Sequence, residues 1–192
     1  MLLDDLAPIT SDRFWDAPLK VVLGGLFLAL VAPIELSLPM GSTEIPLTLQ
    51  SLMVLLMACL LGAGRSSLAV LLYLMLGVLG LPVYAGGASG WTHLFGPTGG
   101  FLFGFVLVAW LAGRAAEQRW GQRWWGLALI MLGGHLLLFI PGGLWLALAT
   151  SWAKVRAAFP PLLPGLVIKS LIGAMLMVGL NAGLRWLIRR KA

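Results

Sequence analysis

Hydrophobic residues dominate the chain in six long runs that are separated by short polar stretches. The runs cover residues 17–34, 46–61, 68–84, 97–112, 124–140 and 162–188. About 20 helical residues, at a rise of 1.5 Å each, cross a hydrocarbon core of about 30 Å, so most of the runs are slightly short. The pattern predicts an all-α integral membrane protein, a six-transmembrane-helix bundle whose shorter spans recruit flanking residues or end at an internal cavity.

The composition agrees with a membrane environment. Hydrophobic residues make up 60% of the chain and charged residues only 10%, whereas soluble domains carry about 25% charged residues. Most of the nine Trp residues lie near the ends of the runs, where an indole keeps its N–H in water and its ring in lipid. We therefore expect a single membrane domain over 17–192, preceded by a cytoplasmic or interfacial tail over 1–16.

The thirteen Lys and Arg residues are distributed unevenly among the connections. Ten of them lie before or in the first turn of the first run, after the second and fourth runs, or among the last eight residues of the chain. The connections 35–45 and 85–96 contain none, and the connection between the last two runs contains Lys154 and Arg156. Because basic residues accumulate on the cytoplasmic side, we expect both termini in the cytoplasm and a multi-pass protein of the cytoplasmic (inner) cell membrane. The basic residues that give the net charge of +6 are better explained by their role in membrane orientation than by nucleic-acid binding.

The hydrophobic runs lack the residues that several classes of chemistry require. All seven acidic residues lie at or before Glu117, and none lies inside a run. Proton-coupled carriers and metal hydrolases need buried carboxylates or several His, Asp or Glu ligands. No glycine-rich segment ends in Gly-Lys-Ser or Gly-Lys-Thr, and Cys59 is the only cysteine. We therefore expect no ATPase site, no metal and no cofactor in this chain.

One enzymatic alternative stays open. Gly87-Ala88-Ser89-Gly90 resembles the Gly-x-Ser-Gly of rhomboid intramembrane proteases, which pair this serine with a histidine in a later span, and His135 lies in the fifth run. The match consists of four small residues in a chain that is rich in them. We prefer the interpretation that the chain is not an enzyme and that His135 is a hydrogen-bonded packing residue or a ligand contact.

Polar and aromatic residues gather near the outer ends of the runs. Thr48 and Gln50 start the second run and need partners, either neighbouring backbone or a ligand. Lys169 lies about 10 Å along the sixth run by helical rise, and a cation at that depth either binds a ligand or snorkels to the interface. The glycine-rich stretch 77–100 is too irregular to face lipid. Within it, Tyr84 and Trp91 are expected to cover the apolar part of a ligand.

Two further patterns concern helix packing. Gly25 and Ala29 are four residues apart and share a helix face, to which either another helix of the bundle or a partner subunit can pack closely. Pro141-Gly142-Gly143 predicts a break in the fifth run, followed by a short amphipathic segment over 144–159 at the outer surface.

Three segments carry motifs in a specific order. They are Ile45-Pro46-Leu47-Thr48-Leu49-Gln50-Ser51 with Leu60-Leu61-Gly62, the stretch 69–87 with its Gly-Leu-Pro-Val-Tyr, and Gly96-Pro97-Thr98-Gly99-Gly100. Together they resemble the BioY family, the biotin-specific substrate-binding components (S-components) of energy-coupling-factor (ECF) transporters. A weaker match lies at 163–169, which is similar to the family's Pro-Gly-Asp-x-x-Lys but has Leu166 where the family usually has aspartate.

The resemblance implies a fold and an assembly. It implies six helices, with biotin held near the outer surface by the loops after the first, third and fifth spans. It also implies high-affinity biotin uptake driven by a transmembrane coupling component (T-component) and two ABC-type ATPase subunits, with Gly25 and Ala29 contacting the coupling component. An S-component for another small vitamin is the alternative within the same class, and transport by the chain alone or as a homo-oligomer stays open.

The resemblance also suggests roles for the candidate residues. Lys169 is expected to meet the carboxylate or a polar ring atom of biotin, while Thr48 and Gln50 hydrogen-bond the ureido group. The carboxylate missing at Leu166 would pair with the lysine or with a ligand N–H. Either Gln50 or a backbone carbonyl replaces it, or this chain differs in affinity or ligand.

Overall fold

The structure is a computed structural model that describes residues 16–40 and 43–191. The elements follow in the order α1 (Asp16–Val31), β1 (Glu35–Met40), β2 (Thr43–Thr48), α2 (Gln50–Leu61), α3 (Ala63–Val78), α4 (Trp91–Leu94), α5 (Gly99–Ala116), α6 (Trp124–Ala149) and α7 (Trp152–Lys191), with short 3₁₀ turns η1 (Ala85–Gly87) and η2 (Trp120–Gln122). The predicted helical class is confirmed for the segments before and after the two strands.

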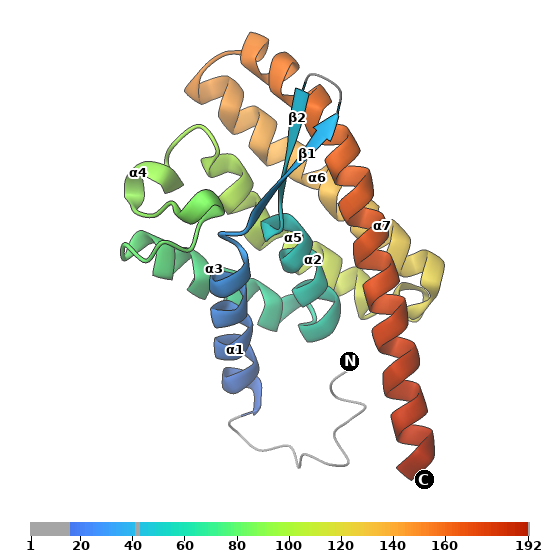
Figure 1. Ribbon diagram of the computed structural model, residues 1–192. Helices are drawn as coiled ribbons and strands as arrows, with labels where there is room; N and C mark the ends of the chain where they lie inside the picture. The colour runs from blue at the N-terminus through green and yellow to red at the C-terminus, as the bar shows by residue number, and fades with distance from the viewer. Residues whose placement is uncertain (1–15, 41–42, 192) are drawn as a thin grey trace.

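The connection between α1 and α2 is a β-hairpin that the sequence analysis did not predict. β1 and β2 pair antiparallel, with Glu35 opposite Thr48 and Met40 opposite Thr43. Polar and apolar residues alternate through much of 35–48, which is the pattern of a strand. Figure 1 shows the hairpin at the end of the molecule opposite the first turn of α1, beside the connection of α6 to α7. An all-α description is therefore incomplete for this connection.

The apolar helices fall into a long group and a short group. Within the described residues, α5, α6 and the segment Trp152–Gly183 of α7 are long and apolar enough to cross a membrane. The apolar helices α2 and α3 are shorter, with 12 and 16 residues, or about 18 and 24 Å by helical rise. α2 begins directly after the hairpin. Because α2 and α3 are short, loops and side chains occupy part of the hairpin end of the bundle.

Helix α6 does not break at Pro141, so that prediction is wrong. The helix continues to Ala149, and α7 begins at Trp152 and continues through Pro160, Pro161 and Pro164. Membrane helices tolerate proline where neighbouring helices pack around it. Here α5 supplies glycines, and a Cβ added to Gly104 would lie 2.7 Å from Pro141 Cγ. The predicted amphipathic segment 144–159 is the last part of α6 and the first turns of α7.

Gly25 packs within the bundle, which is one of the two alternatives that the sequence left open for it. A Cβ added to Gly25 would lie 2.8 Å from Leu72 Cδ2 of α3, so this glycine allows α1 and α3 to approach closely. Ala29 is partly buried against the core. The exposed apolar residues of α1 lie on its other side, at Leu19, Leu23, Leu26 and Leu30.

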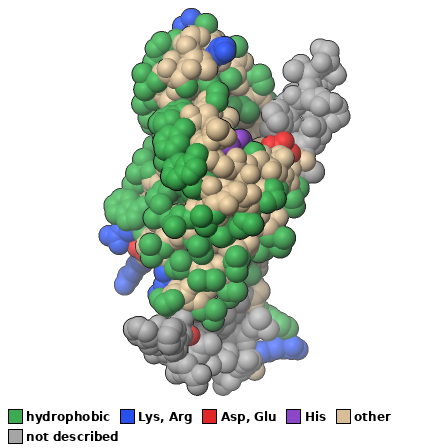
Figure 2. Space-filling view, turned by 90° about the vertical axis from the view of Figure 1, so that its left-hand side faces the viewer, with side chains coloured by type: hydrophobic (Ala, Val, Ile, Leu, Met, Phe, Trp, Pro, Cys, Tyr) green, Lys and Arg blue, Asp and Glu red, His purple; other side chains and the backbone are tan. Residues whose placement is uncertain are grey.

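The protein exposes more large apolar side chains than a surface in contact with water usually does. Leu30, Leu79 and Leu148 are 74%, 77% and 88% exposed, and exposed apolar side chains lie along every long helix. In Figure 2 hydrophobic side chains cover the middle of the face, and Lys and Arg side chains appear at the upper end and in the lower half. The first turn of α1 and the last turn of α7 lie at one end of the molecule (Figure 1). The chain is a membrane protein whose two described ends lie at the same end of the bundle.

Candidate functional site

A cavity of about 370 Å³ lies at the hairpin end of the bundle, and we call it the hairpin cavity. Segments far apart in the sequence form its wall: the base of the hairpin, the first turn of α2, the loop before α5, and parts of α5, α6 and α7. Its lining residues are Glu35, Thr48, Gln50, Ser51, Ala85, His93, Thr98, Phe101, Leu102, Phe105, His135, Leu138, Phe139, Leu162, Gly165, Leu166 and Lys169. A volume of this size is typical of small-molecule sites.

Lys169 brings a positive charge into the cavity from α7. Its Nζ donates a hydrogen bond of 2.8 Å to Ser51 Oγ, in the first turn of α2. An ammonium has three N–H donors, so two remain for whatever fills the cavity. The bond to Ser51 holds a long, flexible side chain in place before a ligand arrives.

His135 lines the same cavity from α6. Its Nδ1 lies 2.9 Å from Met131 O and 2.9 Å from Ser170 Oγ. A carbonyl oxygen can only accept, so Nδ1 carries the proton and Nε2 is an acceptor. Nε2 is buried and has no hydrogen-bond partner among the described residues. An unpaired buried acceptor costs about 1–3 kcal/mol, which a ligand N–H would recover.

Gln50 lines the cavity, and Tyr73 and Tyr84 form an aromatic pair behind it. Gln50 Nε2 donates to the hydroxyl of Tyr73, which leaves the amide oxygen of Gln50 for other partners. Tyr84 donates to Leu74 O at 2.7 Å, and its ring stacks on His93 with ring centroids 5.3 Å apart. Tyr84 is fully buried, so it supports His93 and does not line the cavity itself.

The mouth of the cavity combines a carboxylate with a helix N-terminus. Glu35 is exposed and is the only acidic residue among the described lining residues. Its carboxylate lies against Gly86, where an added Cβ would be 3.4 Å from Oε2. Thr98 precedes α5, whose N-terminus favours negative charge. At the mouth, the carboxylate of Glu35 would repel an anionic group, whereas the N-terminus of α5 would attract one.

Aromatic rings form the apolar wall. Phe101 and Phe139 meet edge to face with centroids 6.4 Å apart, and Phe105 is 4% exposed. Trp91 is 61% exposed, stacks on Phe95, and does not line the cavity. The apolar cover expected from Tyr84 and Trp91 is supplied by phenylalanines of α5 and α6 instead.

The structure brings together four of the six candidate ligand-binding residues. Thr48, Gln50, His135 and Lys169 line the hairpin cavity, and Tyr84 and Trp91 do not. The sequence analysis missed Ser51, His93 and Glu35 as lining residues. Ser51 directly follows Gln50 on α2, and that adjacency was the only signal for it.

The geometry gives no support to the protease alternative or to a metal site. His135 bonds Met131 and Ser170, and Ser89 does not line the cavity. Among the described residues, no group of three or more His, Cys, Asp or Glu side chains is placed to hold a metal ion. The arrangement suits reversible binding of a small polar molecule.

Comparisons with known proteins agree with this description. Residues 11–186 match the sequence model of the BioY family. The biotin transporter BioY2 of Lactococcus lactis subsp. cremoris is 37% identical over 155 residues, which cover 79% of this chain and 82% of that protein. The biotin transporter BioY of Thermotoga maritima is 40% identical over 126 residues, or 62% of this chain and 73% of that protein.

A solved structure shows the same fold. It is the crystal structure of the S-component for biotin from an ECF-type ABC transporter, with a TM-score of 0.62 and 22% sequence identity. The match covers 87% of this chain and 93% of that chain.

Proposed function

The chain belongs to the BioY family, and from this premise we propose that it binds biotin in the hairpin cavity as the substrate-binding component of an ECF-type transporter. The observation that carries the proposal is the pairing of a cationic donor, Lys169, with an unpaired acceptor, His135 Nε2, in one cavity with phenylalanine walls. The ureido group of biotin presents a carbonyl oxygen beside two N–H donors. The valeryl chain and the thioether ring supply apolar surface.

The ureido group is proposed to lie at the deep end. Lys169 and His135 flank Ser170, because Lys169 precedes it in the chain and His135 contacts its hydroxyl. A donor and an acceptor close together match the carbonyl and N–H of a ureido group. The carboxylate then lies toward the mouth, near His93 and the N-terminus of α5, where it keeps part of its hydration.

This orientation gives a physical account of Leu166. The side chain lines the cavity but offers no acceptor, and its backbone oxygen accepts a hydrogen bond of 2.8 Å from Ser170. His135 is connected to the same Ser170 hydroxyl, and its Nε2 has no hydrogen-bond partner among the described residues. We propose that His135 Nε2 takes the acceptor role of the aspartate that the family usually has one helical turn before the lysine.

The test is titration calorimetry with the purified full chain in nonionic detergent. The ligands are biotin, biotinamide, and biotin methylated on a ureido nitrogen. We expect saturable one-to-one binding of biotin, a small loss for biotinamide and a large loss for the methylated compound. No saturable binding of biotin would refute the proposed function. A larger loss for biotinamide than for the methylated compound would reverse the proposed orientation.

The proposed topology has six spans, with both termini in the cytoplasm and the hairpin outside. The connections without Lys or Arg, 35–45 and 85–96, lie with the hairpin, and the basic segments lie toward the other end. Labelling of single cysteines introduced into a Cys59→Ser background, in intact cells, tests this arrangement. Labelling at position 87 and protection at position 118 are expected, and the reverse pattern would invert the protein.

The proposed partners are a transmembrane T-component and two ABC-type ATPase subunits. The chain itself contains no Gly-Lys-Ser or Gly-Lys-Thr motif for ATP binding. Uptake of labelled biotin is expected only in cells that also express such a module. Equal uptake by the chain alone would refute the need for these partners.

A further inference from the structure

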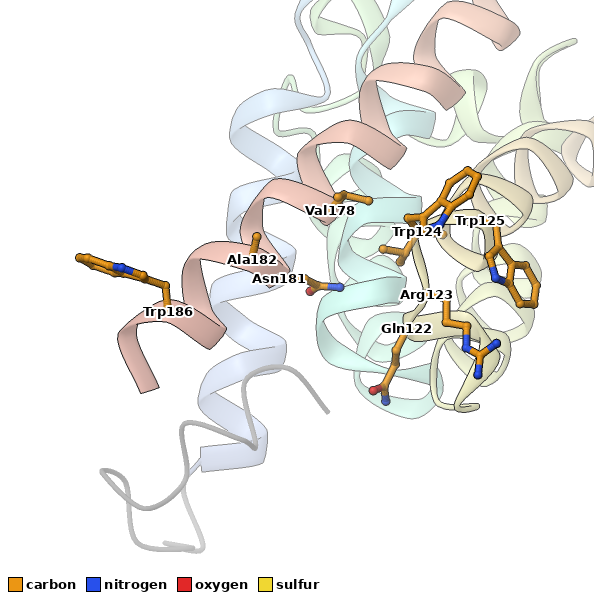
Figure 3. A pocket seen from close by; sticks show the side chains of 9 residues that line it. Gln122, Arg123, Trp124, Trp125, Val178, Asn181, Ala182 and Trp186 are labelled. Carbon is orange, nitrogen blue, oxygen red and sulfur yellow. The ribbon is translucent and has the colours of Figure 1, made fainter. Parts of the chain in front are cut away.

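A second concave site lies at the opposite end of the bundle, between the start of α6 and the last part of α7. We call it the basic-end groove. It is open and measures about 720 Å³. Its lining residues are Gln122, Arg123, Trp124, Trp125, Leu127, Val178, Asn181, Ala182 and Trp186. Figure 3 shows Asn181 on α7 directed across the groove toward the segment that carries Gln122 and Arg123.

The α6 side of the groove favours an anion. Arg123 is the residue that precedes the first turn of α6, and no side chain caps this helix. The first N–H groups of a helix have no acceptor within it, and the helix dipole adds positive potential there. None of the described residues that line the groove is acidic. A phosphate group is the anion that helix N-termini and arginine bind most readily.

The α7 side of the groove requires a hydrogen-bond donor. Asn181 is 7% exposed, and its Oδ1 has no hydrogen-bond partner among the described residues. A buried acceptor without a partner is costly, and an anion cannot satisfy it. An occupant that carries an O–H or N–H close to its negative charge would satisfy this acceptor.

The surroundings are those of a membrane interface. Trp124 and Trp186 are 72% and 54% exposed, and Arg190 lies 4.3 Å from the centroid of the Trp186 ring. Exposed indoles and arginines mark the headgroup level of a bilayer. From this level, exposed apolar residues such as Leu129 and Leu171 continue along α6 and α7, where acyl chains can pack.

We propose that the basic-end groove binds an anionic phospholipid whose headgroup carries a hydroxyl group, such as phosphatidylglycerol. The phosphate lies at Arg123 and the N-terminus of α6, and a headgroup hydroxyl donates to Asn181 Oδ1. The proposal requires a membrane protein and is independent of biotin binding. None of its residues lines the hairpin cavity.

Native mass spectrometry of the full chain in nonionic detergent tests the proposal. The protein is offered equal amounts of phosphatidylglycerol and phosphatidylcholine with the same acyl chains. We expect phosphatidylglycerol to bind at least fivefold more tightly, because it carries a net negative charge beside Arg123 and a headgroup hydroxyl for Asn181. Arg123→Gln should reduce the preference, and Asn181→Leu should weaken phosphatidylglycerol binding about fivefold.

Arg119→Gln is the matched control, because Arg119 is an exposed arginine of the same connection that does not line the groove. It should keep the preference. Equal losses in Arg119→Gln and Arg123→Gln would show unspecific charge attraction and overturn the proposal, as would an absent preference in the unmodified chain. sn-Glycerol 3-phosphate serves as the soluble competitor. Displacement of the lipid by low millimolar amounts would assign the groove to a soluble phosphate instead.

Thermal unfolding of each variant separates loss of lipid from loss of structure. Arg123 is exposed, so Arg123→Gln should unfold at the temperature of the unmodified chain in lipid-free detergent. A preference that is undiminished in folded Arg123→Gln protein would refute the site.

Discussion

The two concave sites of this protein are built in opposite ways. In the hairpin cavity three polar side chains are held by hydrogen bonds within the chain: Lys169 by Ser51, Gln50 by Tyr73, and His135 by Met131 and Ser170. In the basic-end groove, Asn181 Oδ1 is unpaired and the arginine and indoles are exposed. Groups that are fixed in advance lose little entropy when a ligand binds. The cavity thus suits a scarce, defined ligand, and the groove suits an abundant one.

The two sites also differ in how many helices, strands and loops form their walls. The hairpin cavity is assembled from β1, β2, α2, α5, α6, α7 and the loop before α5, whereas the groove uses only the start of α6 with the segment before it, and α7. Movement of any one element changes the cavity, but only the spacing of α6 and α7 changes the groove. Substitutions can therefore break the two sites separately, and the first prediction below compares biotin with phosphatidylglycerol.

Lys169→Ala is expected to have the largest effect. It removes a charged donor from the proposed ureido site, a loss of about 1.5–3 kcal/mol or roughly tenfold to hundredfold in biotin affinity. Phosphatidylglycerol binding should not change. Lys154→Ala is the control, because this exposed lysine of α7 does not line the cavity. Calorimetry measures both affinities, and a change of less than twofold for Lys169→Ala would exclude the proposed role.

Gly77→Ala tests whether the cavity wall is held rigidly from behind. A Cβ at this position would lie 2.2 Å from the Tyr84 ring, and Tyr84 stacks on the lining residue His93. Overpacking of this kind costs about 1–3 kcal/mol, so thermal unfolding should occur at lower temperature and biotin affinity should fall. Gly179→Ala is the matched control, since no atom lies within 4 Å of the added Cβ. Unchanged stability and affinity in Gly77→Ala would show that the wall adapts.

His135→Phe removes the free acceptor and keeps an aromatic ring. The expected loss is about tenfold in biotin affinity, the effect of one hydrogen bond. The variant should also lose most of its discrimination between biotin and ureido-methylated biotin. Ser170→Ala keeps the bond from Nδ1 to Met131, so its loss should be smaller. Retained discrimination in folded His135→Phe protein would contradict the assignment of Nε2.

The sequence predicted the helical membrane class and four cavity residues, because both depend on patterns that act locally. Long apolar runs identify helices, and a lone intramembrane cation such as Lys169 identifies a site. Proline at 141 was read by the rule for soluble helices, which fails where a neighbouring helix with small residues packs around the ring. Glycine spacing at Gly25 could not distinguish packing on α3 from docking of a partner, since both require a small side chain.

The sequence did not predict which residues the tertiary structure brings together in the cavity wall. Phe101 and Phe139 read as ordinary core residues, and only the packing of α5 on α6 turns them toward a cavity. Tyr84 stood in the expected motif but lies behind His93, because Gly77 leaves space for its ring. The unpaired Nε2 of His135 depends on which atoms meet the other ring nitrogen, and no sequence pattern encodes that contact.

Glu35→Gln should change biotin affinity least, and whether the affinity rises or falls reports the orientation of biotin. Glu35 lies at the mouth, so with the biotin carboxylate pointing outward the two negative charges repel each other. Removing the charge should strengthen biotin binding about twofold to fivefold at low salt, with less gain at high salt, because the exposed charges are screened. Biotinamide, which is uncharged, should bind Glu35→Gln and the unmodified chain equally. Weaker binding of both ligands to Glu35→Gln would mean that the carboxylate accepts a ureido N–H at the mouth, so the vitamin would lie the other way round.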